Sequence, residues 1–111
     1  MDIREYIEKG IPIPLGVAGE GGINEYKFGY GDWVSQHGSG TIVFKHQRPG
    51  DANPYSCTLT TEDNIATWKV TSTDTQYAGQ GYLQVIFTSD NAVKKTMVGR
   101  TLIEPSLGES E

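Results

Sequence analysis

The feature that most constrains the fold is a series of short segments, from residue 24 onward, in which β-branched and aromatic residues alternate with polar ones. Such alternation places every second side chain on one face of a strand, so each segment can bury one face and expose the other. Turn-forming residues separate the segments, as they do in antiparallel sandwiches and barrels. The predicted strands cover residues 25–30, 40–47, 55–60, 65–71, 82–88 and 92–103.

The same alternation predicts the core and the connections. Trp68 lies within the 65–71 segment and is expected at the centre of the core. Residues 72–81 break the alternation and predict a helical turn or a crossover between sheets, with Asp74 as its cap. A polar turn at 89–91 predicts that the last two strands form a hairpin. A polar loop that contains His37 is expected between the first two strands.

The first ten residues predict a short helix. Asp2 can cap its start, Glu5 stands at the spacing of a capping box, and Gly10 suits a left-handed C-terminal end. A helix this short needs a surface to dock on, either the body of the domain or a neighbouring subunit. The apolar residues on its expected contact face are Ile3, Tyr6 and Ile7.

Prolines at positions 12 and 14 follow this helix and restrict the next segment to an extended edge strand or arm. We expect this arm to add to a neighbouring subunit. The predicted organisation is a helix and arm over residues 1–22, a β-sandwich over 23–104 and a C-terminal linker or tail over 105–111. The predicted partner-binding residues are Ile3, Tyr6, Ile7, Ile11, Ile13 and Leu15.

Charge and composition exclude several classes of partner. Nine Lys and Arg stand against fourteen Asp and Glu, and the net charge of -5 argues against nucleic acid as a partner. No window approaches the ~20 apolar residues that span a bilayer, and the acidic N-terminus is unlike a signal peptide, so no membrane insertion is expected. A single cysteine, Cys57, allows no internal disulfide.

No catalytic, cofactor-binding or metal-ligating residues are predicted. His37 and His46 are the two imidazoles, and neither lies in a metal-ligand spacing. His46 is expected to face solvent on a strand. Cys57 and His46 could form an activated thiol if their strands pair, but Cys57 lies between Tyr55 and Leu59 in an apolar alternation, which favours an inert buried thiol.

Aromatic residues suggest one ligand hypothesis. Trp33, Tyr26 and Tyr30 could form a platform that stacks on sugar rings, as flat faces of β-sandwiches do. Core packing competes for the same side chains. Tyr82 lies on the face opposite Leu83, which instead indicates an interface.

Four stretches together resemble a known family. They are His46-Gln47-Arg48-Pro49-Gly50-Asp51 with Pro54-Tyr55, then Thr67-Trp68-Lys69-Val70-Thr71-Ser72-Thr73-Asp74-Thr75, then Ala78-Gly79-Gln80-Gly81, and Pro105-Ser106-Leu107-Gly108. In their order and spacing, residues 33–108 resemble a domain found in phage and prophage proteins of Firmicutes, at the start of tail-fibre and baseplate proteins.

This resemblance implies an immunoglobulin-like antiparallel β-sandwich of about seven strands, without the usual disulfide. It also implies a non-enzymatic virion structural protein of the tail, baseplate or capsid surface, assembled in the bacterial host cytoplasm. The expected partners are other virion proteins and further copies of the chain. The alternative is a carbohydrate-binding module that recognises cell-surface glycans. Relatives continue into helical or collagen-like regions where this chain ends.

Overall fold

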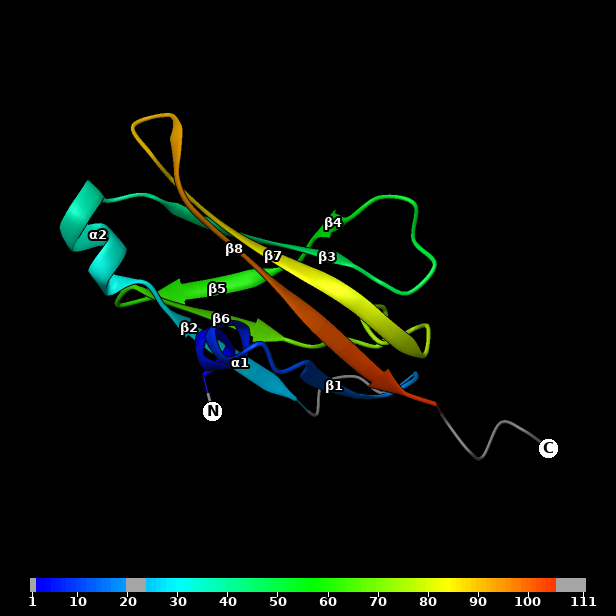
Figure 1. Cartoon of the computed structure of the whole chain (residues 1–111). Coiled ribbons are helices and arrows are strands. Elements are labelled where there is room, and N and C mark those ends of the chain that lie inside the picture. Colours follow the sequence, from blue (N-terminus) through cyan, green and yellow to red (C-terminus); the bar gives the residue numbers. More distant parts are fainter. Residues whose placement is uncertain (1, 20–23, 106–111) are drawn as a thin grey trace.

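The computed structural model describes residues 2–19 and 24–105 of the chain. This part folds as an all-β sandwich of two sheets, which confirms the fold class that the alternation predicts (Figure 1). The elements in chain order are α1 (Ile3–Lys9), β1 (Ile13–Val17), β2 (Glu25–Gly29), α2 (Gly31–His37), β3 (Thr41–Gln47), β4 (Tyr55–Ser56), β5 (Leu59–Glu62), β6 (Ile65–Lys69), β7 (Gly79–Ser89) and β8 (Ala92–Glu104).

The two sheets differ in size. One has five strands in the order β1-β8-β7-β3-β4, and the other has three in the order β2-β6-β5. Paired strands run antiparallel except β1, which runs parallel to β8 and places Ile13 opposite Thr101. β1 therefore lies at the edge of the larger sheet, a position that tolerates Pro14 because an edge strand pairs on one side only.

Two tight hairpin turns have the same chemistry. Asp63 and Asn64 join β5 to β6, and Asp90 and Asn91 join β7 to β8. All four residues have positive φ, between 53° and 62°. A two-residue turn that matches the twist of the strands needs positive φ at both positions, and Asp and Asn tolerate it better than most residues. The predicted final hairpin is confirmed.

Two local predictions are wrong. Residues 55–60 do not form one strand, because Tyr55–Ser56 pairs with β3 whereas Leu59–Glu62 lies in the other sheet. Alternation cannot reveal this change of sheet, since side chains continue to alternate through it. Residues 31–37 form a helix instead of a loop. Tyr30 precedes this helix without a side-chain cap, so the usual start signal is missing.

Aromatic side chains from both sheets meet in the interior. Phe44 packs edge-to-face on Phe28 at 5.9 Å and on Trp68 at 6.1 Å between ring centroids. Phe28 and Trp68 belong to the smaller sheet, and Phe44 belongs to the larger one. All three are buried, so the predicted position of Trp68 in the core is confirmed. These contacts join the sheets in a chain with no internal disulfide.

Helix α1 has the predicted capping. The Asp2 side chain accepts a hydrogen bond from the Arg4 N–H at 2.9 Å, and the Glu5 side chain completes the capping box. Gly10 ends the helix with φ of 70°. These bonds satisfy groups that a short helix otherwise leaves unpaired.

Arg4 then attaches α1 to α2. Its guanidinium donates two hydrogen bonds of 2.8 Å to Asp32 and lies 4.8 Å from the centre of the Trp33 ring. A planar guanidinium can pair with a carboxylate and stack on an aromatic ring at once. The helix is therefore docked on the body of its own domain, one of the two alternatives that the sequence leaves open.

The N-terminal segment is part of the core and does not form a free arm. Ile3, Ile13 and Leu15 are 0%, 0% and 1% exposed, so the prediction that they bind a partner is wrong. β1 closes the sandwich instead: Tyr26 of the opposite sheet donates a hydrogen bond to the Pro14 carbonyl. An apolar, extended segment with prolines fits an edge strand of its own domain as well as an arm that pairs with a neighbouring subunit. The sequence pattern is the same for both.

Leu15→Ala should lower the free energy of unfolding by about 2–5 kcal/mol, because it opens a cavity in the core. Ile11→Ala, at a side chain 42% exposed, should change it by less than about 1 kcal/mol. Urea denaturation of both variants measures the difference. Equal, small effects would show that the segment is a detachable arm.

Candidate interaction surface

Two of the stretches that carry the family resemblance, the one that ends in Tyr55 and the one over residues 67–75, meet at a buried carboxylate. Asp74 is 4% exposed, and its side chain accepts hydrogen bonds from the hydroxyl of Tyr55, from Nε1 of Trp68 at 3.2 Å, and from the backbone and side chain of Thr71 at 2.8 and 3.0 Å. Every partner is a donor, which matches a carboxylate that can only accept. Residues 72–78 form the turn that crosses between the sheets, and Asp74 holds it.

His46 is buried next to this carboxylate, so the prediction that it faces solvent is wrong. It is 0% exposed and packs on Trp68 with 5.5 Å between ring centroids. Burial lowers the pKa of His46 from 6.5 to about 4, and the nearby Asp74 charge only partly opposes this. The imidazole is therefore neutral at pH 7.

The hydrogen bonds around His46 define its tautomer. Tyr55 donates its single hydroxyl hydrogen to Asp74, so its oxygen accepts from Nδ1 of His46 at 3.0 Å. Nε2 then carries no hydrogen and accepts from the Thr101 hydroxyl at 3.2 Å. The network thus reaches from the crossover to β8 and is fully occupied by protein groups.

Arg48 covers the network from outside. Its guanidinium pairs with Asp51 at 2.8 and 3.1 Å and lies about 5 Å from the rings of Tyr55 and Tyr77. It also donates to the Thr73 carbonyl at 3.1 Å, which links the loop after β3 to the crossover. We call the cluster of Asp74, Tyr55, His46 and Arg48 the polar clamp, because its hydrogen bonds tie the crossover to β3, to β4 and to the loop after β3.

The thiol–imidazole pair, the less favoured of the two alternatives for Cys57, does not form. Both ring nitrogens of His46 are used by Tyr55 and Thr101, and the Cys57 N–H instead bonds the Phe44 carbonyl at 2.9 Å. Burial raises the pKa of the Cys57 thiol, which disfavours the reactive thiolate. Within residues 2–19 and 24–105, no group of three or more His, Cys, Asp or Glu could hold a metal ion.

The aromatic platform for sugar rings does not form either. Trp33 is 3% exposed and Tyr30 is 6% exposed, and both pack on Phe87 in the core. Tyr26 is half-buried with its hydroxyl held by Pro14. Core packing, the competing explanation, accounts for all three residues.

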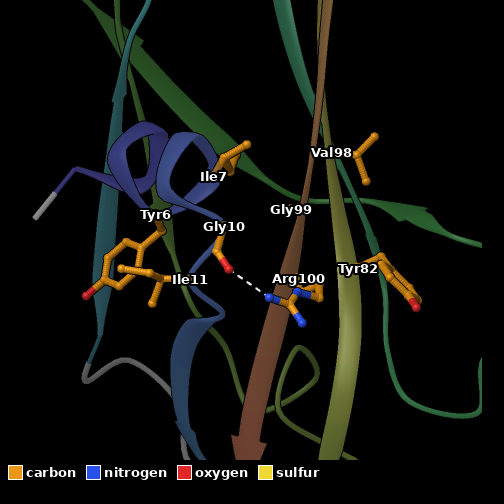
Figure 2. Close-up of a pocket in the computed structure, with 8 residues that line it drawn as sticks. All are labelled: Tyr6, Ile7, Gly10, Ile11, Tyr82, Val98, Gly99 and Arg100. Atoms are coloured by element: carbon orange, nitrogen blue, oxygen red, sulfur yellow. Dashed lines mark hydrogen bonds between the residues drawn. The ribbon is translucent and has the colours of Figure 1, made fainter.

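An apolar groove lies between the N-terminal segment and the outer face of the larger sheet (Figure 2). Its walls come from α1 and the residues after it on one side and from β7 and β8 on the other. The groove measures about 120 Å³, less than the ~300 Å³ of a typical small-molecule site, and fits one or two side chains. It is lined by Tyr6, Ile7, Gly10, Ile11, Tyr82, Val98, Gly99 and Arg100.

Two contacts hold the groove in shape. Arg100 donates a 2.7 Å hydrogen bond to the Gly10 carbonyl across it (Figure 2). Gly99 lets α1 approach β8, because a Cβ at this position would lie 2.7 Å from Cγ1 of Ile7. The groove is therefore built by close packing of distant segments.

Large apolar side chains remain exposed along the groove. Ile11, Tyr82 and Val98 are 42%, 53% and 59% exposed. Of the predicted partner-binding residues, Tyr6, Ile7 and Ile11 line the groove, and Ile3, Ile13 and Leu15 do not. Sequence reasoning identified Tyr82 as an interface residue but missed Val98, which the alternation of β8 with buried Ile103 places on the outer face.

Comparisons with protein-family models, curated proteins and solved structures gave no match to the chain. Among the described residues, no helix has the length and apolar character needed to cross a membrane.

The stability of the protein should depend on His46 between pH 6.5 and 4. The folded state binds the proton less tightly than the unfolded chain, so unfolding takes up a proton in this range and the free energy of unfolding falls as the pH falls. At about 1.4 kcal/mol per pKa unit, the loss attributable to His46 is about 3 kcal/mol. Urea denaturation across this pH range measures it.

His46→Gln should remove this part of the pH dependence, and Thr101→Val should keep it because the imidazole remains. An NMR titration of the unmodified protein gives a second measurement that needs no variant. A His46 pKa near 6.5 in the folded protein would contradict the prediction.

Proposed function

We propose that the chain is a non-enzymatic structural protein of a phage virion, of the tail, baseplate or capsid surface, which binds another virion subunit through the groove between α1 and β8. The observation that carries this proposal is the exposure of Tyr82 and Val98 beside a preformed apolar groove. Exposed apolar side chains around a small hollow are typical of protein–protein contacts. The partner would insert an apolar side chain between them.

The strand order supports an immunoglobulin-like sandwich. A smaller sheet of β2, β6 and β5 faces a larger one in which β8, β7 and β3 are neighbours, and this matches the order of the B, E, D and G, F, C strands of that fold. β4 would extend the larger sheet as the additional strand of variable-type domains does.

The proposed role differs from the sequence-based one in how the protein attaches. The buried β1 segment stabilises the domain, and the contact is made by the outer surface that α1 and β8 form together. Other virion proteins remain the proposed partners, with several copies per particle and assembly in the host cytoplasm. A fold held by packing and hydrogen bonds, with Cys57 unpaired, suits such a reducing compartment.

Particles purified from the phage or prophage that encodes the chain should contain it, detected by mass spectrometry and located by immunogold electron microscopy. The variant Tyr82→Ser/Val98→Thr should be depleted from particles at least about tenfold, because two exposed apolar contacts are lost. Ile65→Thr, at a side chain 40% exposed on the other sheet, is the matched control and should be incorporated normally. Absence of the unmodified chain from purified particles would refute the virion role.

A further inference from the structure

Strand β8 has an open edge over most of its length. β7 pairs with it on one side from Ala92 to Ile103. On its other side β1 pairs only with Thr101 to Glu104. No other strand of the described part of the chain pairs with β8, so residues 92–100 have one unpaired edge.

Helix α1 covers only the end of this open edge. Ile7 lies against Gly99, and Arg100 is bonded to the Gly10 carbonyl. Figure 1 shows the β7–β8 hairpin continuing away from α1 and β1 toward its turn. Residues 93–98 are therefore open to a second chain, and alternate residues of an edge strand present unpaired N–H and C=O groups there.

The side chains along this edge define the chemistry of a partner. Residues 93–100 include Lys94, Lys95 and Arg100, all exposed, and no acidic residue, whereas the whole chain has a net charge of -5. Val93 and Val98 are 61% and 59% exposed beside these charges. A cationic edge with exposed valines is complementary to an extended segment that alternates acidic and apolar residues.

The same charges disfavour pairing between two copies of the edge. Two β8 strands paired over residues 93–98 would bring four lysine side chains together without a compensating carboxylate in the paired stretch, and like charges across a ladder are destabilising. Lysines on an edge strand commonly serve to prevent such self-pairing. The charge pattern therefore favours a different, acidic protein.

We propose that the open edge of β8 at residues 93–98 binds an extended acidic segment of another protein by strand addition. Main-chain hydrogen bonds would extend the five-stranded sheet by one strand, and Lys94 and Lys95 would select for acidic side chains. This inference rests on the proposed attachment function and names its partner class. The groove lies at the end of the same edge, so the added strand would lead toward it.

Three synthetic peptides test the proposal. One is a seven-residue peptide that alternates glutamate with valine, the second has lysine in place of glutamate, and the third is the acidic peptide with N-methylated backbone amides. NMR spectra of the isotope-labelled full chain should show saturable shifts in the amides of residues 93–98 with the acidic peptide, and slower hydrogen exchange there. The lysine peptide should give neither effect, because Lys94 and Lys95 repel it. The N-methylated peptide should also give neither effect, because it lacks the main-chain N–H donors.

Charge-reversal variants make the test specific. Lys94→Glu/Lys95→Glu should weaken binding of the acidic peptide at least about tenfold, because two attractions become repulsions. Lys27→Glu/Lys69→Glu makes the same change at exposed positions of the other sheet and should leave binding unchanged. All four substituted side chains are exposed, so both variants are expected to fold, and their NMR spectra check this.

Absence of shifts at residues 93–98 with the acidic peptide, or equal binding of the N-methylated peptide, would overturn the strand-addition proposal. Concentration-dependent shifts at these residues without any peptide would show that a second copy occupies the edge and would overturn it as well. If no peptide binds but the variant Tyr82→Ser/Val98→Thr is still depleted from particles, the strand-addition proposal fails and the proposed function stands. Peptide binding by a chain that is absent from particles would refute the virion role alone.

Discussion

The buried carboxylate of Asp74 is the constraint on which the rest of the structure depends. A charge with 4% exposure is tolerated only when donors surround it, because its desolvation cost is otherwise several kcal/mol. Those donors come from β4, β6 and the crossover itself, so satisfying Asp74 fixes where the chain leaves one sheet and enters the other. Tyr55 extends the network to His46, and through Thr101 to β8.

The sandwich thus has two chemically different regions. In the polar clamp around Asp74 and Arg48, side chains bind one another: Asp74 accepts from Tyr55 and Trp68, and Arg48 donates to Asp51 and to the Thr73 carbonyl. The α1–β8 groove and the open edge of β8 differ from it, because exposed apolar side chains line the groove and no strand within residues 2–19 and 24–105 pairs with this edge.

Particular elements show how far sequence reasoning reaches. The cap of α1, the Asp-Asn hairpin turn of β7–β8 and the buried Trp68 were predictable because each depends on residues close in sequence. His46, Trp33 and Leu15 were misplaced for a common reason. Their exposure depends on which distant segment packs on them, and a polar or aromatic residue at an alternating position fits both a core and a surface.

The sequence by itself determined the all-β class, most strand positions and the local caps and turns, since alternation and turn chemistry act over a few residues. Only the tertiary structure decided that β1 pairs with β8 of its own domain, that the chain changes sheets between residues 55 and 62, and that α1 and β8 form a groove. The physical reason is that these features arise from contacts between segments as far apart as Gly10 and Arg100. Backbone N–H and C=O groups are the same in nearly every residue, so the strand pairing that leaves one edge of β8 open was visible only in the folded chain.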